Sequence, residues 1–193
     1  MQPVFDILLI GDTRVGKSAF VQRHKTGEFE KRHIPFEGCV TRSLDFYTNR
    51  GLVTLCVTEC DIKTEIPNVD FHGVIMMFDV TNRQSYKNIV SLCEAQRVSL
   101  NVVLCGNKCD CKDREVKAKN MTFHRKHKIP YVEISARSNF RFERPFLEIL
   151  KPLVGSDVVF TDAPALEPPT VEDYIDWQRE MAEDAAMSPK TRR

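Results

Sequence analysis

The strongest constraint on the fold of this chain is an alternation of continuous apolar segments with segments of helical spacing. The apolar segments lie at residues 4–10, 73–80 and 101–105, and a further strand is expected at 131–135. The segments of helical spacing lie at residues 17–25, 84–98 and 144–153. Apolar runs without polar alternation are typical of strands buried on both faces, as in a parallel sheet covered by helices. The sequence therefore predicts an α/β fold with a mostly parallel sheet.

One interruption of this pattern indicates a β-hairpin. Strands are expected at residues 42–47 and 52–57, on either side of the turn sequence Thr48-Asn49-Arg50-Gly51. Asn and Gly are favoured in such turns because they tolerate positive φ. The sheet should therefore contain one antiparallel pair among its parallel strands.

The composition changes past Gly155, where prolines mark a linker before an amphipathic stretch. We therefore expect one domain at residues 1–155, followed by a linker and a helical tail at residues 156–193. The overall composition, with 42% hydrophobic and 28% charged residues, is typical of a soluble globular protein.

Bulk charge and hydropathy argue against two classes of partner. The formal net charge of +1 gives no support for nucleic-acid binding. No apolar run approaches the ~20 residues of a membrane span, and signals for secretion, myristoylation or prenylation are not recognised at the termini. We expect no membrane association, no direct nucleic-acid binding, and a location in the cytosol or nucleus.

The seven cysteines are odd in number and irregularly spaced, which favours reduced thiols over a disulfide framework. Cys105, Cys109 and Cys111 cluster and suggest a metal site. The simpler interpretation is that Cys105 ends an apolar strand, and no histidines stand at zinc-finger spacing.

The chemistry begins at residues 11–18, Gly-Asp-Thr-Arg-Val-Gly-Lys-Ser, which match the phosphate-loop pattern G-x-x-x-x-G-K-[ST]. The motif stands between an expected strand and an expected helix, where backbone N–H groups and the helix N-terminus can surround phosphate oxygens. Lys17 would reach the outer phosphates, and the hydroxyl of Ser18 would bind Mg²⁺. The alternative is an ordinary glycine-containing turn before a helix. The expected strand before the motif and the expected helix after it favour the phosphate loop over this alternative.

The base is selected by a second motif, Asn107-Lys108-Cys109-Asp110, directly after an apolar strand. The Asp110 carboxylate can accept both the N1 and N2 hydrogens of guanine, and adenine offers no matching pair of donors. Sites built on such hydrogen bonds can reject the wrong base by about 10⁴. Ser135-Ala136, at the end of the next strand, would supply a backbone N–H to the guanine carbonyl.

These three motifs together resemble the small GTPases of the Ras superfamily, and the rest of the chain resembles the Ran type within it. The resemblance is carried by residues 25–31, 48–51, 77–81, 103–108, 116–119, 123–126, 138–139, 164–166 and 168–169. It implies a six-stranded sheet surrounded by helices, GTP/GDP and Mg²⁺ as cofactors, and Phe29 packed against the guanine with Lys108 supporting it. The implied partners are importin-β-type transport receptors and a guanine-nucleotide exchange factor, and the implied locations are nucleus and cytoplasm.

The nucleotide-binding residues predicted in this way are Gly11, Asp12, Thr13, Arg14, Val15, Gly16, Lys17, Ser18, Ala19, Phe29, Asn107, Lys108, Asp110, Ser135, Ala136 and Arg137. Ser18 is the predicted metal ligand, and no catalytic residue is assigned.

Departures from the family pattern fall on the two switch segments. The Mg²⁺-binding threonine of the first switch aligns with Phe36, whose ring cannot coordinate a hard cation. In the second switch, Glu59 stands in place of the Asp, as an indirect partner of Mg²⁺. Ile62 replaces the glycine whose N–H meets the γ-phosphate, and Lys63 replaces the water-orienting Gln.

The phosphate loop and the last motif also depart from the family pattern. Thr13 and Arg14 stand where Ran-type sequences carry glycines, and Arg137 replaces a Lys. Arg14 or Lys63 acting as an internal catalytic cation is a further idea. A solvated surface charge is the simpler interpretation of both.

Residues 114–128, here called the basic segment, hold six Lys or Arg residues against one Glu. A solvated helix face is the usual explanation, and the resemblance makes a docking site for acidic partner segments an equal alternative.

Three functional hypotheses follow. The chain is a fully cycling GTPase switch in nuclear import and export, or a divergent relative with degenerate switches that binds guanine nucleotide and hydrolyses GTP slowly or not at all. The third, a nucleotide kinase or ATPase, is opposed by residues 107–110. The switch departures favour the second hypothesis.

Overall fold

The computed structural model describes residues 2–29, 38–96 and 101–163 of the chain. The strands are β1 (Val4–Gly11), β2 (Cys39–Thr48), β3 (Gly51–Asp61), β4 (Gly73–Asp79), β5 (Val102–Asn107) and β6 (Tyr131–Glu133). The helices are α1 (Lys17–Thr26), α2 (Arg83–Gln96), η1 (Ala118–Asn120, a 3-10 turn), α3 (Phe123–Lys126) and α4 (Arg144–Val154).

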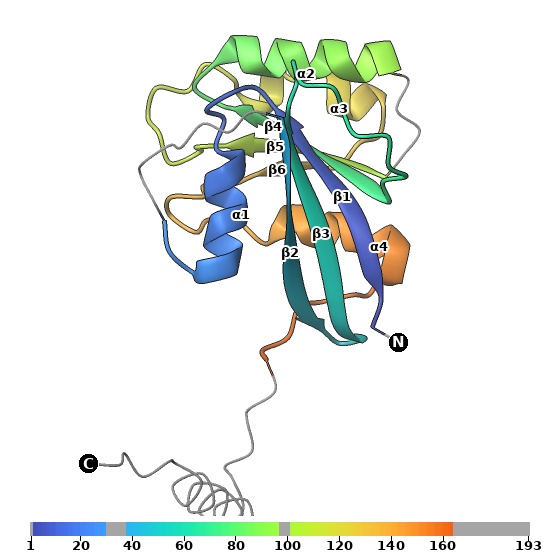
Figure 1. Ribbon diagram of the computed structural model, residues 1–193. Coiled ribbons are helices and arrows are strands. Elements are labelled where there is room, and N and C mark those ends of the chain that lie inside the picture. The colour runs from blue at the N-terminus through green and yellow to red at the C-terminus, as the bar shows by residue number, and fades with distance from the viewer. Residues whose placement is uncertain (1, 30–37, 97–100, 164–193) are drawn as a thin grey trace, which may run out of the picture. The chain divides into compact units, whose positions relative to one another are not determined.

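The six strands form one sheet in the order β2-β3-β1-β4-β5-β6 (Figure 1). Only β2 and β3 pair antiparallel, through the hairpin that turns at residues 48–51, and the other neighbours are parallel. The predicted α/β fold and the predicted hairpin are therefore confirmed. β3 runs to Asp61, four residues past its predicted end, because it stays paired with β1 as far as Gly11.

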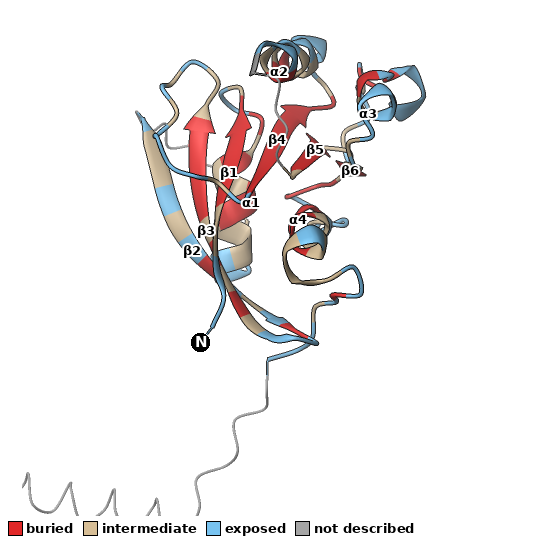
Figure 2. Cartoon of the chain, turned by 90° about the vertical axis from the view of Figure 1, so that its right-hand side faces the viewer, coloured by how far each residue is buried: buried red, intermediate tan, exposed pale blue. Residues whose placement is uncertain are grey.

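Helices cover both faces of the sheet, and the central strands divide their side chains between them. Ile7 and Leu9 of β1 belong to a core cluster that also contains Phe20 of α1 and Phe146 of α4. The intervening Leu8 and Ile10 belong to a second cluster with Ile89 of α2 and Phe123 of α3. Successive side chains of a strand point to opposite faces, so a continuous apolar run is what a doubly covered strand needs. Figure 2 shows the resulting burial of β1, β3 and β4 and the more exposed edge strand β2.

Residues just past Gly155, which were expected to belong to the linker, pack against the hairpin. Val158 is buried, Phe160 forms a bridge with Thr48, and Arg50 pairs with Asp157 at 2.8 Å. The compact unit is Met1–Asp162. The predicted tail at 164–193 lies outside the described residues, so its helix stays a prediction.

One disulfide joins the two strands of the hairpin, between Cys39 and Cys60. These residues stand directly opposite each other in the antiparallel register, with their Cα atoms 4.6 Å apart. The expectation of reduced thiols is therefore wrong for this pair, because the sequence alone does not show which residues the register brings together. The other five cysteines are free thiols. Within the described ranges, no helix has both the length and the apolar character needed to cross a bilayer.

Candidate functional site

The carboxyl ends of the parallel strands meet at one edge of the sheet, and the sequence motifs lie there. β1 ends at Gly11, β3 at Asp61, β4 at Asp79 and β5 at Asn107. Ligands of open α/β sheets bind in the crevice outside such strand ends, at the point where the strand order reverses. In this sheet the connections lead to one side of β1 and then to the other.

The loop between β1 and α1 has the backbone form that the phosphate-loop motif predicts. Gly16 precedes α1 with φ 102°, a left-handed conformation that L side chains rarely adopt. A Cβ at Gly16 would overlap the Asn107 amide, and one at Gly11 would overlap the carbonyl of Met77. The missing side chains therefore leave room for the loop to close against the neighbouring strands. The ten-residue helix α1 begins directly after the loop, with its N-terminal N–H groups at this edge.

Lys17 is buried at the base of this loop. Its side chain is 7% exposed, and Nζ donates hydrogen bonds to the carbonyl oxygens of Gly11 at 2.7 Å and Asp12 at 2.8 Å. Its nearest ion-pair partner is Asp61, with Nζ and Oδ2 separated by 3.9 Å. Burial lowers the pKa of Lys17, and the carboxylates of Asp61, Glu59 and Asp12 oppose that shift.

Glu59 lies beneath the loop as a fully buried carboxylate. One oxygen, Oε1, pairs with Arg42 of β2, and the other, Oε2, has no hydrogen-bond partner among the residues that the structure describes. Burial raises the pKa of Glu59, and the neighbouring hydroxyl of Ser18 and the Arg42 guanidinium work against that rise. An unpartnered carboxylate oxygen beside a hydroxyl is a pair of hard oxygen donors, which fits Mg²⁺. Mg²⁺ in such proteins takes its remaining ligands from water and substrate phosphates, so Ser18 would hold the ion with Glu59 in support.

Asn107 ties the three motif loops together. Its Nδ2 donates to the carbonyl of Val15 in the phosphate loop at 2.9 Å. Its Oδ1 accepts the backbone N–H groups of Lys108 at 2.8 Å and Ala136 at 3.1 Å. The side chain is 2% exposed, and all three of its hydrogen bonds are made to other groups of the protein. Asn107 is therefore a positioning residue that fixes the phosphate loop against the base-binding loops.

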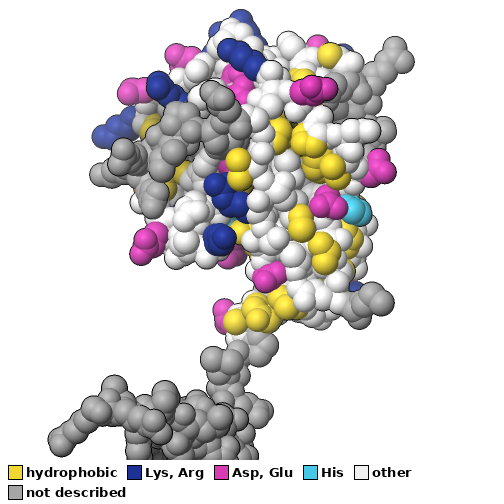
Figure 3. Space-filling view, viewed as in Figure 1, with side chains coloured by type: hydrophobic (Ala, Val, Ile, Leu, Met, Phe, Trp, Pro, Cys, Tyr) yellow, Lys and Arg dark blue, Asp and Glu magenta, His cyan; other side chains and the backbone are white. Residues whose placement is uncertain are grey.

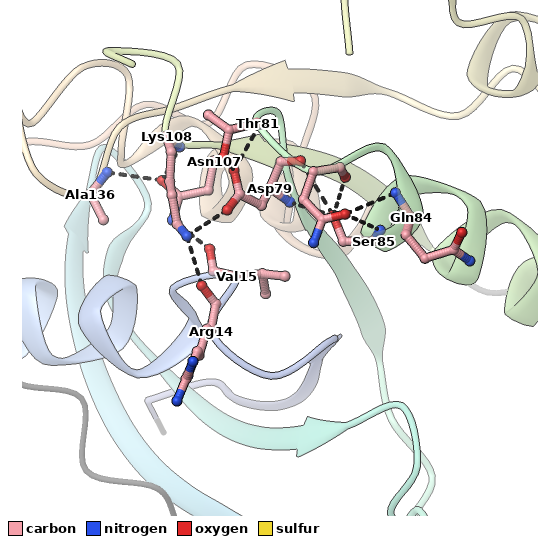
Figure 4. Close-up of polar contacts among 10 residues, drawn as sticks. Arg14, Val15, Asp79, Thr81, Gln84, Ser85, Asn107, Lys108 and Ala136 are labelled. Atoms are coloured by element: carbon pink, nitrogen blue, oxygen red, sulfur yellow. Dashed lines mark hydrogen bonds and ion pairs between the residues drawn. The ribbon is translucent and has the colours of Figure 1, made fainter. Parts of the chain in front are cut away.

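Lys108 reinforces the same junction (Figure 4). Its Nζ donates to the carbonyl of Arg14 at 2.8 Å and to Oδ2 of Asp79 at 2.5 Å. Asp79 is itself fixed, because its Oδ1 accepts bonds from Thr81 and its backbone N–H donates to the buried Ser85 hydroxyl. These bonds hold Lys108 against the phosphate loop, and the resemblance expects this residue to support the base.

The remaining predicted residues differ in their degree of exposure. Asp110 is exposed in the turn after Lys108, as a ligand-facing carboxylate needs to be. Ala19 and Phe29 are half-buried and pack against the core cluster beneath α1. Thr13, Arg14 and Arg137 are exposed.

The backbone N–H groups of Ser135 and Ala136 already have partners inside the protein. The Ser135 amide donates to the carbonyl of Phe140 at 3.1 Å, and the Ala136 amide donates to Asn107. A guanine carbonyl would therefore have to share one of these amides or take the next one, that of Arg137. The sequence assigned this contact to Ser135-Ala136 because motif spacing does not reveal internal partners.

The switch departures are only partly described. Phe36 lies outside the described residues. Ile62 packs partly buried against the core on the α2 face, and Lys63 is exposed, with its backbone N–H bonded to Oδ1 of Asp61 at 3.1 Å.

Several positioning residues were not found by sequence reasoning. Arg23 of α1 donates to Oδ1 of Asn139 at 2.5 Å and to the carbonyl of Arg137 at 3.1 Å, which holds the last motif loop. Asn88 of α2 donates to the Asp12 carboxylate at 2.8 Å. The residues around Arg23 and Asn88 give no indication of these roles. Asp79 does have such an indication, because it is the single charged residue in an otherwise apolar run.

In comparison with known protein families, the chain matches the model described as the Ras family over residues 6–154. The matched span is 149 of the 193 residues and contains the phosphate loop, residues 107–110 and residues 135–137. Proteins of that family bind GTP and GDP with Mg²⁺.

Proposed function

This chain belongs to the Ras family, and we propose that it is a Ran-type guanine-nucleotide-binding protein in the transport of proteins between nucleus and cytoplasm. The observation that carries guanine binding is the Asn107 junction, where one buried side chain bonds to the phosphate loop and to both base-binding loops. Such an arrangement has one evident use, which is to hold a phosphate site and a base site at a fixed separation. GTP and GDP, with Mg²⁺ at Ser18, are the proposed ligands.

Nucleotide binding is tested by isothermal titration with GDP and ADP in the presence of Mg²⁺. GDP should bind and ADP should not, because Asp110 offers acceptors that only guanine can use. Asp110→Ala should reduce the preference for GDP by at least about 10², within the range seen for hydrogen-bonded specificity. Asp113→Ala is the matched control, since Asp113 is an exposed carboxylate in the same loop. Equal affinity of the wild type for GDP and ADP would refute guanine binding.

Hydrolysis is proposed to be slow, because the groups that orient water and meet the γ-phosphate are replaced. Lys63 cannot orient water as an amide does, and it is exposed. Ile62 packs against the core on the α2 face. A fully cycling switch is the competing proposal, and a GTP turnover rate equal to that of an ordinary Ran-type protein would favour it.

The proposed partners, importin-β-type transport receptors and an exchange factor, would recognise charged surfaces. On the face shown in Figure 3, basic and acidic side chains are interspersed, which gives no large surface of one sign. The basic segment is more concentrated. Arg114 pairs with Glu133 at 2.6 Å and Arg125 bonds to backbone carbonyls, whereas Lys117, Lys119, Lys126 and Lys128 are exposed.

The receptor proposal is tested with charge reversal on this segment. The double variant Lys126→Glu with Lys128→Glu should weaken binding to an importin-β-type receptor by about tenfold or more, because like charges then face an acidic partner. Lys87→Glu, at an exposed position on α2, is the control and should leave affinity unchanged. Equal effects of the two changes would remove the basic segment from the proposed interface.

A further inference from the structure

Asp61 is held against the phosphate loop from two sides. It is the last residue of β3 and stands opposite Gly11 in the parallel register. Its Oδ2 accepts a hydrogen bond from the Thr13 hydroxyl at 2.7 Å, and its Oδ1 accepts the backbone N–H of Lys63 at 3.1 Å. Both carboxylate oxygens therefore have a fixed donor, so the negative charge has a fixed position beside the loop.

The same carboxylate is the ion-pair partner of Lys17, with Oδ2 3.9 Å from Nζ. The lysine ammonium has three donors, and two of them reach the carbonyls of Gly11 and Asp12. The third donor and the positive charge are what the lysine of a phosphate loop offers to the outer phosphates. Any fixed anion next to Lys17 therefore competes with the outermost phosphate for that charge.

We propose that Asp61 acts as a built-in anion at Lys17, which makes the site selective for guanosine diphosphate over guanosine triphosphate. The inference rests on the proposed guanine-nucleotide function and extends it by naming the ligand. GTP carries one more phosphate than GDP, at the end that Lys17 attracts, and that phosphate would meet a carboxylate of the same sign. GDP lacks this phosphate and leaves the Lys17–Asp61 pair intact.

Thr13 has a part in this selectivity. It stands where Ran-type sequences carry a glycine, and its hydroxyl is the donor that holds Oδ2 of Asp61. Glycine at this position offers no such donor. Thr13 and Asp61 therefore act together, because Asp61 supplies the charge and Thr13 fixes its position.

The test measures the affinity of the nucleotide-free full chain for GDP and for a non-hydrolysable GTP analogue, by isothermal titration with Mg²⁺ present. The wild type should bind GDP at least about tenfold more tightly, since one like-charge contact in a partly buried site is worth that much or more. Asp61→Asn keeps the shape and one acceptor oxygen, but it removes the charge and the acceptor for one of the two donors, Thr13 or Lys63. It should raise affinity for the analogue by about tenfold and change affinity for GDP by less than about threefold.

Two further variants make the test specific. Asp45→Asn removes the same charge from an exposed position on β2, near the hairpin end of the sheet, and should change neither affinity. Thr13→Ala frees the Asp61 carboxylate and should shift the selectivity in the direction of Asp61→Asn. It also keeps the inference testable if Asp61→Asn does not fold, which far-ultraviolet circular dichroism would show.

The possible outcomes separate this inference from the function on which it rests. Equal wild-type affinity for GDP and the GTP analogue would overturn the role of Asp61 while leaving guanine-nucleotide binding in place. An equal effect of Asp61→Asn on both nucleotides would do the same. If the wild type binds neither nucleotide, the proposed function fails, and the inference fails with it.

Discussion

Replacing Asn107 by Ala is the sharpest test of how the site is assembled. The change removes three hydrogen bonds, to Val15, Lys108 and Ala136. The bonds to Val15 and Ala136 are buried, so their carbonyl and N–H groups would be left without partners. Each buried group left unsatisfied costs about 1–3 kcal/mol. We therefore expect Asn107→Ala to lower the free energy of unfolding by about 3–4 kcal/mol, or about 6–16 °C in Tm for a domain of this size.

Urea denaturation without nucleotide, followed by far-ultraviolet circular dichroism, measures this loss without any contribution from bound ligand. Asn107→Asp keeps the acceptor for Lys108 and Ala136, but it sets a buried carboxylate oxygen against the Val15 carbonyl, so its loss should be at least as large. Asn68→Ala, at an exposed loop position, is the control and should stay within about 0.5 kcal/mol of the wild type. A loss below about 1 kcal/mol for Asn107→Ala would refute the idea that this side chain holds the three loops together.

Three further expectations concern pH, backbone strain and turnover. Burial among phenylalanines lowers the pKa of His24 from 6.5 to about 4. As the pH falls, His24 is therefore protonated in the unfolded chain before it is protonated in the folded protein. The contribution of His24 to the free energy of unfolding is constant above about pH 6.5 and decreases as the pH drops toward 4, by about 2 kcal/mol at pH 5. Urea melts at pH 7.5 and 5 should show this loss in the wild type and not in His24→Phe, and parallel behaviour of the two would contradict it. Arg14 has φ 66°, so Arg14→Gly should raise the free energy of unfolding by about 1 kcal/mol, and a lower urea midpoint would count against strain at this residue. Single-turnover phosphate release from bound GTP should be at least about 10² slower than for a Ran-type protein with an intact second switch, and an equal rate would show that Lys63 or Arg14 replaces the missing groups.

The sequence alone predicted the fold through local patterns. The apolar run that contains Ile7, Leu8, Leu9 and Ile10 predicted a strand with two buried faces, and the structure divides these residues between two core clusters. The turn at residues 48–51 predicted the hairpin. The phosphate-loop motif and the base-binding motifs could also be recognised in the sequence. Both depend on residues that are close together in the chain, at a turn or at the polar end of a strand.

Hydrogen-bond partners across the site were not predictable, because they join residues that are far apart in the chain. Thr13 and Asp61 are 48 positions apart, Lys108 and Arg14 are 94 apart, and Arg23 and Arg137 are 114 apart. The contact of Thr13 with Asp61 depends on the pairing register of β1 with β3, since a shift of one residue would turn the Asp61 side chain to the other face. The antiparallel register of β2 with β3 set Cys39 opposite Cys60, contrary to the expectation of reduced thiols. The sequence determined which strands and loops this chain can form, because those preferences are local. Only the tertiary structure decided that a carboxylate would stand beside Lys17, because that position is fixed by how two strands align.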